Sequence, residues 1–152
     1  MREYMGLYRG KRVDNGEWVE GSLFLRKDTT GKVFEAFIVE DAYEQIAYWQ
    51  IYIRSNLKSE CYRIDIDTVG ECTGLPDKNG NLIFEGDIVR QHGLKWLVGY
   101  QRGAFACIDE KNEMFFAFFE QYDFYKGEYR FPDTFEIIGN IHDNPELLGS
   151  EG

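Results

Sequence analysis

Apolar residues alternate with polar ones along most of the chain, and Gly residues separate the alternating runs at short intervals. Alternation with a period of two is typical of strands that bury one face. The runs that we expect to form strands are 7–13, 17–25, 33–39, 46–54, 61–66, 71–75, 82–84, 88–91, 95–100, 105–108 and 135–141. Short strands at close spacing, separated by Gly turns, predict a strongly bent antiparallel sheet that forms a small barrel or roll.

The first two of these strands are joined at Asn15-Gly16. Asn-Gly is a strong hairpin signal because both central residues of a type I′ turn need φ > 0. A two-residue turn at this point predicts that Val13 lies opposite Trp18. One face of the second strand then carries Val19, Gly21, Leu23 and Leu25, and the other carries Trp18, Glu20, Ser22 and Phe24. Neither face is fully polar, so we expect partial cover on both sides.

Residues 74–89 contain two turn signals that organise the centre of the chain. Asp77 and Gly80 occupy the first and fourth positions of a type I turn, and Gly86-Asp87 allows a second sharp bend. We expect the carboxylate of Asp87 to accept turn N–H groups. The residues assigned to this structural signature are Asp77, Asn79, Gly80, Gly86 and Asp87.

The segment 109–122 departs from strict alternation. Its apolar stripe consists of Met114, Phe115, Phe118, Phe119 and Tyr122. This spacing favours a helix, although the same density of aromatic residues also fits a buried strand. We expect a second short helix after residue 141, capped by Asp143 or Asn144, with Pro145 in its first turn.

The length of 152 residues supports one domain, or two small lobes that share a core. We place the lobes at 1–67 and 68–152, packed as one globular unit. The chain is 43% hydrophobic and 16% aromatic, which is enough to form a core and favours a mainly β fold.

The net charge of −10 argues against a general nucleic-acid-binding role. Arg9, Lys11 and Arg12 form a local basic group, for which a solvated strand edge is the favoured interpretation. Three Cys residues without paired spacing indicate reduced thiols and a cytoplasmic protein. The sequence has no apolar run of 18 residues, so we expect no membrane span.

Candidate chemistry is weak throughout the chain. The segment 77–81 has alternate oxygen ligands, but Leu82 and Ile88 occupy the positions at which a calcium loop needs Gly and Glu. The acidic pairs 65/67 and 85/87 offer general acid–base chemistry, with turn formation as the favoured alternative. The neighbours of Cys107 indicate a buried structural thiol. We therefore expect no catalytic residue, no metal and no cofactor.

Three segments in order, 8–21, 67–89 and 136–148, reach nearly from end to end, and the central stretch from Thr73 to Val89 is the most specific. These segments resemble the YopX-like family of conserved bacteriophage and prophage proteins. The resemblance implies a mainly β fold whose C-terminal part is an SH3-like roll, and an origin in a phage or prophage. It implies no activity, and therefore no catalytic residues.

The remaining class of function is recognition. An aromatic group in a charged, Gly-containing segment consists of Tyr122, Phe124, Tyr125, Tyr129 and Phe131. These rings either form a partner surface or cap the open end of the roll. The function expected is a non-enzymatic module that binds a host or phage protein, or a second copy of itself. The alternatives are a nucleic-acid-binding module or DNA mimic, and a small hydrolase that uses acidic residues.

Overall fold

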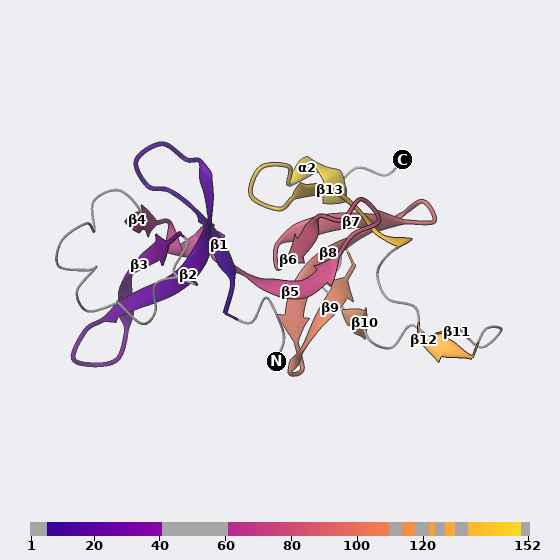
Figure 1. Ribbon diagram of the computed structural model, residues 1–152, viewed down its shortest axis with the longest axis horizontal. Helices are drawn as coiled ribbons and strands as arrows, with labels where there is room; N and C mark the ends of the chain where they lie inside the picture. Colours follow the sequence, from indigo (N-terminus) through magenta and orange to yellow (C-terminus); the bar gives the residue numbers. More distant parts are fainter. Residues whose placement is uncertain are drawn as a thin grey trace. The chain divides into compact units, whose positions relative to one another are not determined.

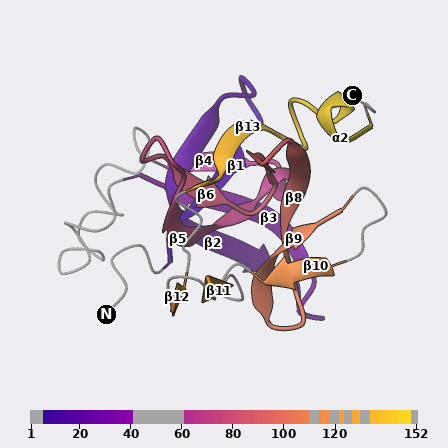
Figure 2. The ribbon, with the colours of Figure 1, turned by 90° about the vertical axis from the view of Figure 1, so that its right-hand side faces the viewer.

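The computed structural model describes residues 6–40, 61–109, 114–117, 122–123, 127–129 and 134–149 (Figures 1 and 2). Strands dominate these residues, and the helical segments among them are the short η2 and α2. The chain divides between Glu71 and Cys72 into two units. The predicted mainly β fold, built from bent antiparallel sheets, is confirmed. None of the helices that the structure describes is long and apolar enough to cross a membrane.

The first unit is an antiparallel sheet in which the first four strands lie side by side in chain order and the fifth strand pairs with the first. Its elements are β1 (Tyr8–Lys11), β2 (Trp18–Lys27), β3 (Val33–Val39), β4 (Cys61–Ile64), η2 (Ile66–Thr68) and the start of β5 (Gly70–Pro76). The sheet order is β4-β3-β2-β1-β5. A single bridge between Arg12 and Ile64 brings the end of β4 back beside the residue that follows β1, so the sheet is strongly curled.

The β1–β2 hairpin differs from its predicted register. Lys11, and not Val13, lies opposite Trp18. The loop spans residues 13–16, with the Arg12 N–H donating to the Glu17 carbonyl at 2.9 Å and Gly16 at φ 72°. A shift of two residues leaves every side chain on its predicted face, because side chains alternate with a period of two. The predicted division of β2 into two faces therefore holds despite the wrong turn length.

The core of the first unit is formed by Val19, Ala36, Ile38 and Ile64, all at most 7% exposed. Two glycines allow the strands to approach closely. A Cβ on Gly10 would lie 2.1 Å from the Ile64 side chain, and one on Gly21 would lie 2.1 Å from the Val39 carbonyl oxygen. Gly occupies these positions because no larger residue fits between the strands.

The second unit contains a five-stranded antiparallel sheet in the order β10-β9-β8-β7-β13, together with the β5–β6 pair. Its further elements are β6 (Leu82–Phe84), β7 (Asp87–Gln91), β8 (Leu94–Gln101), β9 (Ala104–Ile108), β10 (Met114–Ala117), β11 (Tyr122–Asp123), β12 (Glu128–Tyr129), β13 (Glu136–Asn140) and α2 (Glu146–Gly149). Neither sheet closes into a barrel among the described residues. The SH3-like description of this part stays a prediction.

Two tight turns connect the central strands of this sheet. His92 and Gly93 have φ values of 50° and 80°, and Arg102 and Gly103 have values of 52° and 80°. Positive φ at both central residues is the signature of two-residue type I′ hairpins, whose twist matches that of the strands. The turn at 92–93 thus sets β7 against β8, and the turn at 102–103 sets β8 against β9.

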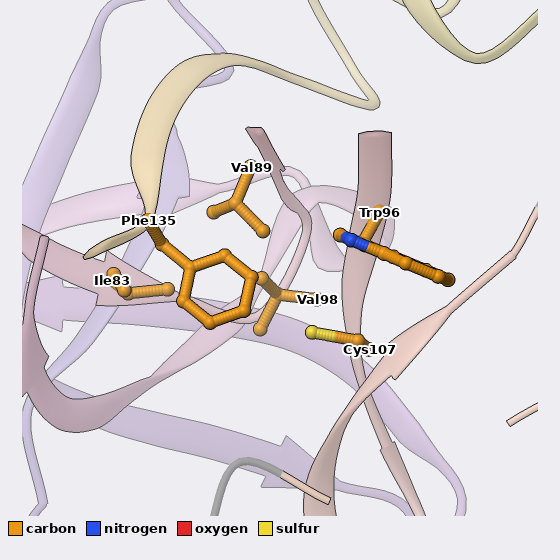
Figure 3. Close-up of a cluster of buried hydrophobic side chains, with 6 residues drawn as sticks. All are labelled: Ile83, Val89, Trp96, Val98, Cys107 and Phe135. Carbon is orange, nitrogen blue, oxygen red and sulfur yellow. The ribbon is translucent and has the colours of Figure 1, made fainter. Parts of the chain in front are cut away.

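The core of the second unit surrounds Phe135, whose ring lies among side chains from several strands (Figure 3). Its buried members are Ile83, Val89, Trp96, Val98, Cys107 and Phe135. Phe135 directly precedes β13, so the start of this last strand is anchored in the core. The short helix expected after residue 141 is present as α2.

The helix predicted for 109–122 is wrong over Met114–Ala117, which form strand β10 beside β9. Met114 lies opposite Ile108, and the pairing shifts between Met114 and Phe116. Pairing with β9 decides the structure here, because a tertiary partner overrides local spacing. The strand expected at 46–54 lies outside the described residues.

Substitution of Gly21 tests the close approach of β2 and β3. We expect Gly21→Ala to lower the free energy of unfolding by about 3 kcal/mol, because the new methyl group meets backbone rather than a flexible side chain. The control is Gly149→Ala, whose Cβ would meet nothing within 4 Å. Urea denaturation of both variants measures the difference, and equal stabilities would contradict the packing described.

Candidate functional site

Asp77 is a buried carboxylate, 3% exposed, and accepts three backbone hydrogen bonds. Its Oδ1 accepts from the N–H groups of Asn79 and Asn81, each at 2.9 Å. Its Oδ2 accepts from the N–H of Ile137 in β13 at 3.1 Å. The Gly80 N–H closes the turn on the Asp77 carbonyl at 3.0 Å, with φ 84° at Gly80. One side chain thus holds the turn together and ties it to β13.

The bend at Gly86-Asp87 is built in the same way. Asp87 is 2% exposed, and its Oδ2 accepts from the Phe84 N–H at 2.8 Å. The Gly86 N–H donates to the Val98 carbonyl at 2.8 Å, and the Gly86 carbonyl accepts from Ile141 at 2.9 Å. The carboxylate of Asp87 therefore serves the local backbone.

In the acidic pair 65/67, the carboxylate of Asp65 also has a local role. The Asp65 carboxylate accepts from the Asp67 N–H at 3.1 Å and caps η2. Both residues are exposed. Over the described part of the chain, no group of three His, Cys, Asp or Glu side chains is arranged to hold a metal ion.

Two of the three thiols are buried. Cys107 is 0% exposed and Cys72 is 5% exposed, whereas Cys61 is half-buried. Burial raises the pKa of Cys107 to about 12. A thiol with so high a pKa is almost entirely protonated at neutral pH and is a poor nucleophile.

The basic group near the start of the chain packs on aromatic rings of its own sheet. The Arg9 guanidinium lies 4.8 Å and the Lys11 ammonium 5.5 Å from the centre of the Trp18 ring. The Arg12 guanidinium lies 4.2 Å from the Tyr62 ring. These cations contact rings from within the unit, and the ring of Trp18 is therefore a poor stacking platform for a nucleic-acid base.

The aromatic group proposed as a partner surface is only partly within the described residues. Tyr122 and Tyr129 lie opposite each other in β11 and β12, which form a two-stranded sheet of their own. Phe124, Tyr125 and Phe131 lie outside the described residues. The structure thus brings together two of the five predicted positions by backbone pairing.

The surface that sequence reasoning missed is the outer half of the β2–β3 hairpin, residues 22–35, which we call the arm. β1 pairs with β2 only from Trp18 to Gly21. From Ser22 onwards, β2 pairs with β3, and no described strand lies on its other side. The signal in the sequence was the unequal length of the first two strands, because a longer strand must extend past a shorter partner.

The hydrogen-bond alternation of the ladder shows which residues face this open edge. The Arg12 N–H donates to the Glu17 carbonyl across the β1–β2 pair. Alternate residues of a strand direct their N–H and C=O groups to the same side. Leu23, Leu25 and Lys27 therefore direct these groups toward the open edge, in line with Glu17.

The arm exposes apolar side chains beside charged ones. Leu25 is 45% exposed and Phe34 is 47% exposed. The Arg26 guanidinium lies 5.1 Å from the Phe34 ring and forms an ion pair with Glu35 at 2.6 Å. Exposed apolar residues beside an open strand edge are typical of sites at which another polypeptide binds.

Comparison with known proteins places this chain in a family. The family model described as "YopX protein" matches residues 7–149. The chain belongs to the YopX family. The crystal structure of protein EF1440 from Enterococcus faecalis is similar to it, with 26% identity over 93% of this chain and 96% of that one and a TM-score of 0.45. A search of curated proteins gives no match.

Removal of the Asp77 carboxylate tests its structural role in this YopX family member. We expect Asp77→Ala to lower the free energy of unfolding by about 3 kcal/mol, because three backbone N–H groups lose their acceptor in a buried site. Asp67→Ala, at an exposed position, is the control, with an expected change within about 0.5 kcal/mol. Similar losses in the two variants, measured by urea denaturation, would show that the Asp77 bonds contribute little.

Thiol labelling tests the burial of the cysteines. At pH 8 a thiol with a pKa near 12 is ionised in only about one molecule in ten thousand. We expect iodoacetamide to modify Cys61 first and to reach Cys72 and Cys107 only in urea. Cys61→Ser should therefore abolish fast labelling of the folded chain, as mass spectrometry can show. Rapid modification of Cys107 in the folded protein would refute this arrangement.

Proposed function

We propose that this YopX family member is a non-enzymatic accessory protein of a phage or prophage, which acts in the bacterial cytoplasm by binding a protein. The observation that supports the proposal most strongly is the arm, where Leu25 and Phe34 are exposed beside an open strand edge. The phage origin rests on the resemblance of the chain to conserved bacteriophage and prophage proteins. The partner is a host or phage protein, or a second copy of the chain.

Two of the four acidic residues that suggested a hydrolase, Asp65 and Asp87, have a local structural use, which favours this choice, and the same holds for Asp77. Asp77 and Asp87 accept backbone N–H groups in buried turns, and Asp65 caps η2. A carboxylate that accepts backbone hydrogen bonds is held in place by its turn and already has a structural role. These three carboxylates therefore offer little support for acid–base catalysis.

Nucleic-acid binding is less well supported than protein binding. The chain has 27 acidic and 17 basic residues, and a phosphate backbone repels such an excess of negative charge. Arg9 and Lys11 are already placed over Trp18. The DNA-mimic alternative needs a continuous acidic surface, and the arm instead exposes Arg26 and Lys27.

Photo-crosslinking in cells tests the proposed function. The photoreactive residue p-benzoylphenylalanine replaces Leu25 in one variant and Leu94 in the control. Leu94 is 58% exposed but lies in the second unit. We expect irradiation of bacteria that carry the phage or prophage to give protein adducts from position 25 and none from position 94. The absence of any adduct from position 25 would overturn the arm as a binding surface.

A further inference from the structure

The open edge of the arm offers a row of backbone groups in a fixed geometry. Leu23, Leu25 and Lys27 direct their N–H and C=O groups away from β3. Leu25 and Lys27 are exposed. Backbone groups on an open edge form hydrogen bonds with water or with an added strand. In strand addition, the added strand replaces the water as the hydrogen-bond partner.

The tip of the arm is held in place, so that the edge is formed in advance of binding. The Asp28 carboxylate accepts from the Thr30 and Lys32 N–H groups at 2.8 and 3.0 Å. The Asp28 N–H donates to the Lys32 carbonyl at 2.9 Å. A preformed strand loses less conformational entropy on binding than a mobile loop does.

The edge also lacks the irregularity that commonly protects open strands. A bulge is present in the hairpin, between the Arg26–Glu35 and Lys27–Val33 pairs. The extra residue of this bulge is Phe34, which belongs to β3. The open edge of β2 is therefore regular from Leu23 to Arg26, whereas bulges that block strand pairing lie on the exposed strand itself.

The side chains along the edge indicate what kind of segment fits. Leu25 shares its face with Ala36 and Ile38 of the core, so an apolar residue is favoured opposite it. At the far end, Lys27 and Lys32 have no ion-pair partner among the described residues and are exposed. Acidic residues of a partner are therefore favoured opposite this end, although the net charge of the whole chain is negative.

We propose that the arm binds an extended segment of a partner protein as an additional antiparallel strand along Leu23–Lys27. The segment is acidic opposite Lys27 and apolar opposite Leu25. In an antiparallel pair the acidic residues come first in the segment and the apolar ones follow. This inference rests on the proposed function and specifies how the arm would bind its partner.

A fluorescent peptide, acetyl-Ser-Glu-Glu-Val-Thr-Val-Thr-amide, tests the inference on the purified full chain. Its first Val is designed to lie opposite Leu25, with its N–H directed to the arm. N-methylation of that Val removes a hydrogen-bond donor, and we expect affinity to fall about tenfold or more. N-methylation of the next residue, whose N–H points away, is the matched control and should change affinity little. Fluorescence anisotropy measures all three peptides.

Charge is tested in the same assay. Lys27→Glu should lower the affinity for the acidic peptide. It should raise the affinity for a peptide that has Lys in place of both Glu residues. Leu25→Lys should lower the affinity for both peptides. Equal effects of the two N-methyl groups, or no saturable binding of the parent peptide, would overturn strand addition by such a segment.

A second copy of the chain is the other possible occupant of the edge. A dimer of the free chain that Leu25→Lys dissociates, seen by analytical ultracentrifugation, would assign the edge to self-association and overturn the peptide proposal. The proposed function would survive that result, because crosslinking at position 25 would still yield a protein adduct. The proposed function fails only if position 25 captures no protein in cells.

Discussion

Every strand of an open antiparallel sheet must find partners for its backbone N–H and C=O groups, and both units of this chain are arranged around that requirement. Side chains act as partners where the ladder is interrupted. Asp77 accepts N–H groups at the central turn, and the Thr68 hydroxyl accepts the Lys11 N–H at 2.8 Å. Unsatisfied buried backbone groups are costly, so these polar side chains stabilise the chain at the points where the ladder is interrupted.

The arm is the place where no described strand meets this requirement along one edge of β2. β2 extends well beyond β1, and the turn at its tip is closed by hydrogen bonds to the Asp28 carboxylate. Such an edge is a hazard in a protein without a partner, because it invites unspecific pairing. The exposed Arg26 and Lys27 limit that hazard by adding charge, and in our proposal the charge of Lys27 favours an acidic segment.

The sequence alone predicted most strand positions, because alternation and Gly turns are local signals. Val33–Val39 and Leu82–Phe84 coincide with β3 and β6. The register of β1 against β2 was not predictable from Asn15-Gly16, because the Arg12–Glu17 hydrogen bond closes a longer loop. Met114–Ala117 was mistaken for helix because its partner, β9, is invisible to a local spacing argument.

Chemistry was harder to predict than fold. The turn residues Asp77 and Asp87 were recognisable, because Asp and Gly at fixed offsets have a local meaning. The burial of these two residues could not be predicted, because it depends on residues far along the chain, such as Ile137 for Asp77. The exposure of Leu25 depends likewise on where β1 ends, and alternation alone places it with the buried residues of its face.

We propose that the edge of β2 from Leu23 to Lys27, which no described strand covers, is open in the free protein. Native-state hydrogen exchange followed by NMR tests it residue by residue. The amides of Leu25 and Lys27 should exchange close to the rate of an unstructured peptide, whereas those of Phe24 and Arg26, which face β3, should be slowed about a hundredfold or more. Equal protection of the two sets of amides would show that the edge is already occupied and would contradict the account.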